Sequence, residues 1–288
     1  MSTRAWIAFV ALCVIWGIPY FFIKQAVAEL SPACIAFGRL ALGAALLLPI
    51  AWHRGAFRNL SAHKGPLLAF AVCELVGPFF LIAYGEQAIS SSLAGTLLAA
   101  VPLMVVLIGP AIGIHERLGR RRFIGLAVGL AGVVALLGID TIQGSDEWIG
   151  AACVLIAAVG YAIGPLIVQR YMADSDSLGA TAVSLALGAL ILLIPAALTA
   201  PTTMPSSTAI IAVAVLGFVC TALGLVIFLF LIREATASRA TVITYVNPAV
   251  AVLLGVLILD ERFGIGAMTG LALILIGSWL ATSRTAHA

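Results

Sequence analysis

Apolar residues in this chain gather into long runs, and short polar connections separate them. A helix needs about 20 predominantly apolar residues to cross roughly 30 Å of hydrocarbon, and ten runs have that character. Their expected bounds are Ala5–Ile23, Ala33–Trp52, Pro66–Tyr84, Leu93–Ile114, Phe123–Ile139, Trp148–Val168, Leu178–Ala197, Ala209–Ile232, Ala240–Leu259 and Ile265–Ala281. The pattern predicts an all-α integral membrane protein with ten transmembrane helices.

The chain also repeats itself. The residues that recur 146 positions apart are Ser92, Ala94, Pro102 and Gly109 in the first half and Ser238, Ala240, Pro248 and Gly255 in the second. Glu116-Arg117 returns 145 positions later as Glu261-Arg262. The two copies cover 1–144 and 145–288, with five expected spans each. Because the number of spans per copy is odd, the second copy enters the membrane from the opposite side. Such inverted repeats are typical of secondary transporters, in which a central site opens to each side alternately.

Composition agrees with the hydrophobic pattern. Apolar residues make up 63% of the 288 and charged residues only 9%, whereas ordinary soluble domains carry about 25% charged residues. The connections between the runs are short, so they leave no room for a nucleotide-binding domain or a catalytic ectodomain. We therefore expect no soluble domain in this chain.

The distribution of Lys and Arg predicts the orientation. One of the fifteen, Arg39, lies inside an expected span, and Lys24 and Arg262 are the two that would lie outside the cell if the N-terminus is cytoplasmic. The twelve that would then be cytoplasmic are Arg4, Arg54, Arg58, Lys64, Arg117, Arg120, Arg121, Arg122, Arg170, Arg233, Arg239 and Arg284. Because cytoplasmic connections carry an excess of Lys and Arg, we predict a multi-pass plasma (inner) membrane protein with both termini in the cytoplasm.

Several of these features together resemble a known family. They are Trp16-Gly17 and Lys24 in and after the first span, Arg39 in the second, Pro102 and Pro248 within spans, and Glu-Arg followed by a glycine-punctuated span. In order and spacing the chain resembles the EamA-type branch of the drug/metabolite transporter superfamily, and within it the bacterial exporters of amino acids, aromatic ones included. The resemblance implies ten helices around a central cavity, with the fifth and tenth at the periphery. The second half departs from the first, with Ser184 in place of Arg39 and Gln169 in place of Lys24.

Two ionisable side chains lie inside expected spans, Arg39 and Glu74. Charges within a membrane are costly and usually face a cavity or each other. Neither is reproduced in the second half, where Glu74 meets Cys220, and this asymmetry favours a working role. Three roles remain open: a structural ion pair, a contact from Arg39 to a substrate carboxylate, and proton coupling through Glu74.

Aromatic residues gather where a cavity would lie. Small-molecule pockets are mostly apolar with a few placed polar groups, so we predict that the substrate site is formed, together with Arg39 and Glu74, by Trp16, Tyr20, Phe79, Tyr84, Tyr161, Tyr245 and Asn247. Trp16 and Tyr161 are repeat equivalents and the strongest of these. Tyr84 could equally belong to an interfacial aromatic belt.

Proline inside a helix removes a backbone hydrogen bond and bends the helix. Pro19, Pro102, Pro165 and Pro248 lie within expected spans, and Pro102 and Pro248 are repeat equivalents. They are candidate hinges between the two halves, although static kinks that fit curved packing would leave the same pattern.

Glycines in the fifth and tenth spans form small-xxx-small stripes, which let helix backbones approach closely. The stripes consist of Gly125, Gly129 and Gly132 in the fifth span and Gly266, Gly270 and Gly277 in the tenth. Packing within one protomer and packing between two in a homodimer are both open, and a monomer is as plausible as a dimer.

We predict a secondary transporter, an exporter by resemblance, that moves small amphipathic metabolites, most of all amino acids, by alternating access. A drug or other metabolite carrier of the same fold is the alternative. A channel would need rings of like charge or a carbonyl filter, and an enzyme would need a nucleophile beside a base; the sequence displays neither. We expect no cofactor or metal, because His53, His63, His115 and His287 lie in connections or tails without ligand spacing. The expected partners are a small substrate and membrane lipids, with no nucleic acid.

Overall fold

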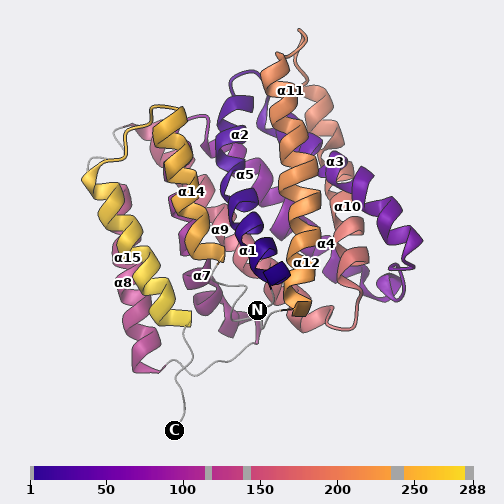
Figure 1. The fold of residues 1–288 in the computed structure, drawn as a ribbon, viewed down its shortest axis with the longest axis horizontal. Helices are drawn as coiled ribbons and strands as arrows, with labels where there is room; N and C mark the ends of the chain where they lie inside the picture. The colour runs from indigo at the N-terminus through magenta and orange to yellow at the C-terminus, as the bar shows by residue number, and fades with distance from the viewer. Residues whose placement is uncertain (1–2, 114–118, 139–143, 235–242, 283–288) are drawn as a thin grey trace.

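A computed structural model describes residues 3–113, 119–138, 144–234 and 243–282. The regular elements in these ranges are helices, drawn in Figure 1 with the start of the chain at the bottom. In the first half they are α1 (Thr3–Gly17), α2 (Pro19–Ala26), α3 (Pro32–His53), η1 (Leu60–His63), α4 (Lys64–Phe70), η2 (Ala71–Val76), α5 (Gly77–Gly85), α6 (Ser91–Leu97), η3 (Leu98–Ala100), α7 (Val101–Ile108), η4 (Gly109–Ile112) and α8 (Arg120–Gly138).

The second half starts after the undescribed residues 139–143. Its elements are α9 (Ser145–Tyr171), α10 (Ser177–Leu198), α11 (Ser207–Ala214), η5 (Val215–Leu223), α12 (Gly224–Glu234), α14 (Ile243–Ile258) and α15 (Ile265–Thr282). The expected positions of Glu116-Arg117 and Ser238 lie outside the described residues.

Seven continuous helical segments of the described chain are long and apolar enough to cross a membrane. They are Thr3–Ala26, Pro32–His53, Leu60–Gly85, Ser91–Ile112, Ser145–Tyr171, Ser177–Leu198 and Ser207–Phe228. Three further apolar helices, Phe123–Leu137, Val246–Ile258 and Ile265–Leu280, are shorter and occupy the expected fifth, ninth and tenth spans. The all-helical, multi-pass architecture is confirmed by length and composition, and the count of ten spans stays a prediction.

Two of the long segments change to π-helical geometry midway, where backbone hydrogen bonds run from residue i to i+5. They are η2, between α4 and α5, and η5, between α11 and α12. Glu74 of η2 and Cys220 of η5 are 146 positions apart. Both halves therefore change from α-helical to π-helical geometry at matching places. Single π-helical turns inside α-helices are rare and occur frequently at functional sites.

The contacts between the two halves follow a regular pattern. The helix α3 packs against α10 at one side of the molecule, and α8 packs against α15 at the other. In between, α1 packs against α14 and α12, and α9 packs correspondingly against α7 and α5. Each half therefore contributes to every part of the bundle, and neither forms a separate body (Figure 1).

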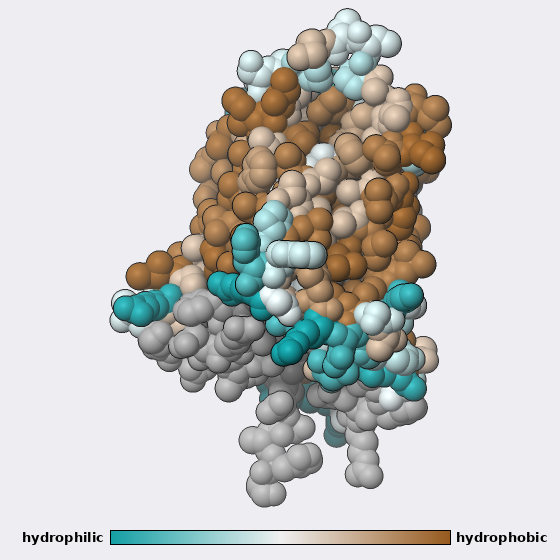
Figure 2. Space-filling model, turned by 90° about the vertical axis from the view of Figure 1, so that its right-hand side faces the viewer, coloured by the Kyte–Doolittle hydropathy of each residue, from teal (hydrophilic) through white to brown (hydrophobic). Residues whose placement is uncertain are grey.

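A broad apolar band covers the face on which α3 and α10 lie (Figure 2). Leu190, Leu193, Ile194 and Leu198 of α10 are large apolar residues with exposed side chains. Hydrophilic side chains gather below the band and smaller polar groups above it. An apolar girdle between two polar rims is the surface that a bilayer requires of a helical protein, because hydrocarbon offers no hydrogen-bond partners.

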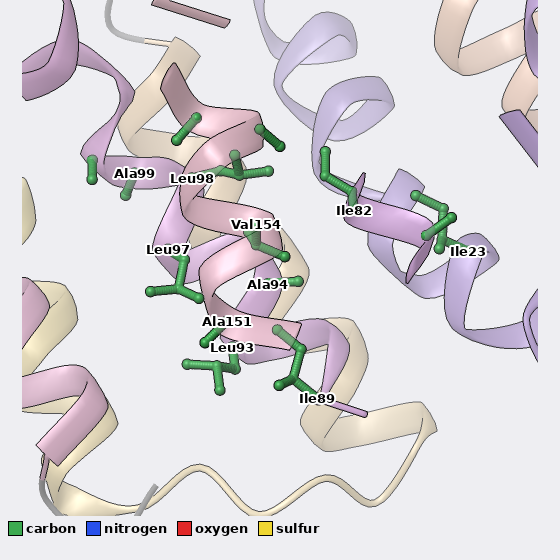
Figure 3. Close-up of a cluster of buried hydrophobic side chains, with 14 of the residues drawn as sticks. Ile23, Ile82, Ile89, Leu93, Ala94, Leu97, Leu98, Ala99, Ala151 and Val154 are labelled. Carbon is green, nitrogen blue, oxygen red and sulfur yellow. The ribbon is translucent and has the colours of Figure 1, made fainter. Parts of the chain in front are cut away.

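The largest buried apolar cluster lies where α9 meets α6, η3 and α5 (Figure 3). Leu93, Leu97 and Leu98 from the first half face Ala151 and Val154 of α9 in the second. Small residues on α9 let the neighbouring backbones come close, so van der Waals packing can hold the helices together in lipid.

The glycine stripes lie against each other within the chain. A Cβ built on Gly132 would come 2.9 Å from the carbonyl oxygen of Gly270, and one on Gly277 would come 2.3 Å from the amide nitrogen of Gly129. The stripes thus join α8 to α15 inside one protomer. A homodimer stays a prediction, and it would have to form through another face of the protein.

Candidate functional site

Arg39 lies near the middle of α3 and is only 7% exposed. Its Nε donates a hydrogen bond of 2.8 Å to Thr221 Oγ1 of η5, and its Cζ lies 3.6 Å from the centre of the Phe79 ring of α5. The cation is therefore held between three helical segments, one of them from the second half. A guanidinium over an aromatic face is stabilised by the ring quadrupole, more so when water is excluded.

The π-helical turn of η5 explains why Thr221 can hold the arginine. Thr221 Oγ1 donates to the carbonyl oxygen of Leu216, five residues earlier, at 2.8 Å. The hydroxyl has one proton to donate and lone pairs left to accept, so both of its functions are used. This locks the acceptor toward α3 and fixes the direction of the Arg39 side chain.

Most of the guanidinium remains free for another partner. Arginine carries five N–H donors in a rigid fork, and Nε is the donor with a hydrogen bond to the protein; the terminal nitrogens have none in the described chain. The two terminal nitrogens of Arg39 are not fully enclosed by protein, so they face accessible space. The fork geometry matches a carboxylate, which it binds through two parallel hydrogen bonds.

Two tyrosines from opposite halves lie within electrostatic range of Arg39. They are Tyr20 of α2 and Tyr161 of α9, which also lie within range of each other. Tyr20 packs its ring over α6, where a Cβ on Gly95 would come 3.2 Å from Tyr20 Cδ2. Sequence analysis predicted both residues, and the structure brings them together with Arg39 and Phe79.

Glu74 points away from Arg39 toward α9. A Cβ on Gly164 would come 2.8 Å from the Glu74 Cβ, so the glycine makes room for the acidic side chain. Glu74 Oε2 is enclosed and has no hydrogen-bond partner in the part of the chain that the structure describes. The anticipated ion pair between Glu74 and Arg39 does not form, because α3 turns its arginine toward η5 while η2 turns its glutamate toward α9.

Glu86 is a buried acid that sequence reasoning missed. It follows the last residue of α5, so it reads as part of a polar connection, yet it is 0% exposed. Neither oxygen of its carboxylate has a hydrogen-bond partner among the described residues. Burial raises the pKa of the Glu86 carboxyl well above its usual range, with Lys24 and Arg39 opposing and the negative charge of Glu261 adding to the rise.

Lys24 joins the end of α2 to the turn that follows α5. Its Nζ donates to the carbonyl oxygens of Glu86 at 2.7 Å and Ile89 at 2.8 Å. The cation therefore binds the backbone of the turn and not the Glu86 carboxylate. Free carbonyls at a helix end need such donors, which explains why a lysine ends the first span.

Glu261 binds the start of α6 at the same end of the molecule. Its Oε1 accepts from the amide of Ser91 at 2.8 Å, and its Oε2 accepts from the amide of Ser92 at 2.9 Å and from Ser92 Oγ at 2.6 Å. Burial alone would raise the pKa of Glu261, but these hydrogen bonds outweigh it and hold the pKa below its usual range. A carboxylate at a helix N-terminus satisfies orphan amides and complements the helix dipole.

A third acid completes this end. Glu29 accepts from Ser206 Oγ and from the Ser206 amide at the start of α11, and these bonds lower its pKa. We call this rim the Glu261 end. The opposite rim, the His63 end, carries a contact of His63 Nε2 with Asp174 Oδ1 at 3.2 Å. Of the two, the Glu261 end is the one where hydrogen bonds between distant segments accumulate.

The remaining predicted site residues have contacts of their own. The indole of Trp16 donates to the Cys220 carbonyl oxygen at 3.2 Å and packs against Phe228, with ring centres 5.0 Å apart, so it fastens α1 to the second half. Tyr84 is 43% exposed and stacks on Phe80. Asn247 is partly buried, and its backbone carbonyl faces α1. The side chain of Tyr245 lies outside the described residues.

The four candidate hinge prolines behave in two ways. The helix of the first span breaks before Pro19, which starts α2, and a 3₁₀ turn, η3, precedes Pro102 at the start of α7. Pro165 and Pro248 lie inside the continuous helices α9 and α14. At η3 the Ala99 carbonyl accepts from Ser278 Oγ of α15 at 3.2 Å. The α-helix is therefore interrupted beside the prolines of the first half and continuous through those of the second. Whether any of these prolines acts as a hinge stays a prediction.

A membrane-spanning helix bundle with a polar cluster in its interior is the arrangement of a protein that handles polar solutes within a bilayer. Comparison with known families agrees. The model of the EamA-like transporter family matches this chain twice, over residues 3–138 and 148–283. The chain belongs to the EamA-like transporter family, and each half is one copy of its domain.

Individual relatives cover nearly the same length. The chain is 31% identical over 259 residues to the "Uncharacterized inner membrane transporter YedA" of Escherichia coli (strain K12), covering 86% of this chain and 80% of the relative. It is 23% identical over 285 residues to the "Uncharacterized transporter YoaV" of Bacillus subtilis (strain 168), covering 97% of each. A solved crystal structure with 20% identity has a TM-score of 0.69 over 98% of both chains, which shows a shared fold.

Proposed function

We propose that this protein is a secondary transporter of amino acids, aromatic ones included, and that it exports them from the cytoplasm by alternating access. The observation that carries the proposal is the set of free guanidinium donors of Arg39, buried between α3, η5 and α5. A buried arginine with unpaired donors suits an anionic group, and a zwitterion brings one. Phe79 and Tyr161 beside it suit an apolar side chain.

A negative group suits the other end of a zwitterion. Glu74 has a buried carboxyl oxygen without a protein partner among the described residues. Glu74 and Arg39 share a neighbour, since Tyr161 lies within electrostatic range of both. A site with one cation and one flanking acid favours a substrate with both charges over a simple anion.

We further propose that the two halves form an inverted repeat of five spans each, 1–144 and 145–288. The matching π-helical segments η2 and η5 and the paired contacts of α1 and α9 support this symmetry. The basic residues at the His63 end, with Arg54, Lys64 and Arg170, support a cytoplasmic location of that rim, because positive charge marks the cytoplasmic side. An inner-membrane location agrees with the name of the relative YedA.

The test is exchange of labelled phenylalanine in proteoliposomes, with phenylalaninamide as a competitor that lacks the carboxylate. Phenylalanine should compete strongly and the amide weakly. In Arg39→Gln the apparent affinity for phenylalanine should fall about 10- to 100-fold, as expected for losing a hydrogen-bonded charge contact, while the amide is affected little.

Arg54→Gln is the matched control, because Arg54 is exposed at the His63 end and lies outside the cluster. Exchange with no saturation, or equal competition by the amide and the amino acid, contradicts amino acid recognition by Arg39. A carrier of lipophilic cations is the second candidate, favoured by the unpaired acid Glu74. It predicts that tetraphenylphosphonium exchanges and phenylalanine does not.

A further inference from the structure

Glu86 is the most enclosed ionisable side chain of the described chain that has no hydrogen-bond partner. It is 0% exposed, and both carboxyl oxygens are unpaired. An ionised carboxylate in such a position lacks the water, the hydrogen bonds and the paired cation that normally compensate its desolvation. The arrangement therefore suits the protonated acid, which carries no net charge.

The groups that face Glu86 come from each packed element. From α2, Lys24 is engaged with two backbone carbonyls, and Tyr20 lies within electrostatic range. Arg39 of α3 is held by Thr221. Next to α14, Glu261 carries a negative charge that Ser91 and Ser92 stabilise.

The helix α9 packs against the turn that carries Glu86, since a Cβ on Gly150 would come 2.8 Å from the Gly85 carbonyl oxygen. Its acid Glu147 lies one turn before Gly150. The negative charge of Glu261 opposes ionisation of Glu86, and burial outweighs the opposing effect of Lys24 and Arg39. The surroundings favour the neutral carboxylic acid over the carboxylate.

The position of Glu86 explains how this state could change. The Glu261 end is closed by Lys24 on the turn after α5, by Glu261 on α6 and by Glu29 on α11. If this rim separates, Lys24 leaves the carbonyls of Glu86 and Ile89 and water reaches the carboxyl group. The O–H bond of the acid then breaks, the proton passes to water, and the freed ammonium of Lys24 can pair with the carboxylate.

We propose that Glu86 is a proton-binding site that is protonated while the Glu261 end is closed and releases its proton when that end opens. The proposal rests on the transport function proposed above, because opening and closing are steps of that cycle. It makes a transmembrane proton gradient one of the forces that act on the carrier. Glu86 then couples the gradient through the closure of the rim, without contact to Arg39.

Two measurements on the purified full-length protein test this. The first is infrared difference spectroscopy, which detects the carbonyl band of a protonated carboxylic acid without any transport. The wild type at neutral pH should show a protonated band that disappears in Glu86→Gln and persists in Glu29→Gln. Glu29 is the matched control, because it lies at the same rim but is exposed and hydrogen-bonded to Ser206.

The second measurement is uptake of labelled phenylalanine by proteoliposomes, with and without an imposed pH gradient. In the wild type the gradient should change accumulation several-fold. Glu86→Gln resembles the neutral acid in shape, so it should keep exchange without a gradient and lose the response to the gradient. Glu86→Asp, which can still bind a proton, should retain part of the response and its own protonated band.

The outcomes separate the two proposals. Absence of phenylalanine exchange in the wild type removes the proposed function, while the infrared band still decides whether Glu86 holds a proton. A band that survives in Glu86→Gln, or a gradient response that survives in it, overturns the role of Glu86. A band lost in Glu74→Gln instead would assign the proton to η2 and also overturn it.

Discussion

The π-helical segments η2 and η5 occupy matching places in the two halves and carry different chemistry. In η5, Thr221 accepts from Arg39 and donates to Leu216, so its hydroxyl is fully satisfied. In η2, Glu74 keeps an enclosed oxygen without a partner among the described residues. The two halves thus share the π-helical backbone geometry, but the polar side chains of the two segments differ. One segment holds a cation in place, and the other leaves an acid available.

The largest effect should come from filling the space beside η2. A Cβ on Gly160 would lie 2.4 Å from the backbone oxygen of Cys73, so Gly160→Ala must push two helices apart. We expect about 3 kcal/mol of destabilisation, the upper range for overpacking, measured by thermal unfolding in detergent. Gly43→Ala near η5 should cost less, because its Cβ would meet only side-chain atoms, the nearest being the Thr221 methyl at 3.1 Å.

Gly65 provides the control for this pair. It lies in α4 with nothing near its Cβ position, so Gly65→Ala should be neutral or slightly stabilising through helix propensity. If Gly160→Ala unfolds at the same temperature as Gly43→Ala, the close approach of α9 to η2 makes no special contribution to stability.

Removing the hydroxyl that anchors the arginine should have the next largest effect. Thr221→Val keeps the shape of the side chain but leaves the buried Arg39 Nε without its acceptor. An unsatisfied buried donor costs about 1–3 kcal/mol, so the unfolding temperature should fall and phenylalanine exchange should weaken with it. Thr96→Val is the control, because the buried Thr96 hydroxyl only bonds the Ser92 carbonyl of its own helix. Equal losses in both variants would mean that Thr221 has no special role.

A smaller difference should separate the repeat equivalents Trp16 and Tyr161. Trp16→Phe removes the indole donor to the Cys220 carbonyl of η5 and should cost about 1 kcal/mol, the usual net worth of one hydrogen bond. The Tyr161 hydroxyl has no hydrogen-bond partner to lose among the described residues, so Tyr161→Phe should leave the unfolding temperature unchanged and alter substrate affinity. A stability loss in Tyr161→Phe would show that its hydroxyl is structural.

The smallest effect on stability should come from Glu74 itself. Because its enclosed oxygen has no hydrogen bond to lose, Glu74→Gln should change the free energy of unfolding by less than about 0.5 kcal/mol, since a group of the same shape replaces it. Exchange of the substrate, in contrast, should change if the acid has a working role. A large loss of stability with normal exchange would make Glu74 a structural residue.

The helices could be predicted from sequence because long apolar runs have one stable solution in a bilayer, where backbone groups must be paired within the segment. Tyr20, Arg39, Phe79 and Tyr161, which lie together in the structure, were predicted by the same logic, since aromatic and charged residues inside such runs are conspicuous. Their partners were not predictable, because the rotation of each helix decides what a side chain meets. Tyr84 and Tyr161 are similar in sequence context, yet one faces outward and the other inward.

Other features left no local signal. The π-helical turns of η2 and η5 contain ordinary apolar residues around Glu74 and Thr221, so no distinct sequence pattern marks that geometry. Glu86 was missed for a different reason. It follows a span directly, as acids in exposed connections do, and its burial depends on the fold of the turn beneath Lys24 and beside Glu261.

The glycine contact between α8 and α15 has a consequence for how the protein is made. The helix α8 ends at Gly138, and its partner in the glycine contact, α15, starts at Ile265. During synthesis α8 is therefore made before its partner exists, and α15 covers the glycine face of α8 only after the chain has been translated through that helix.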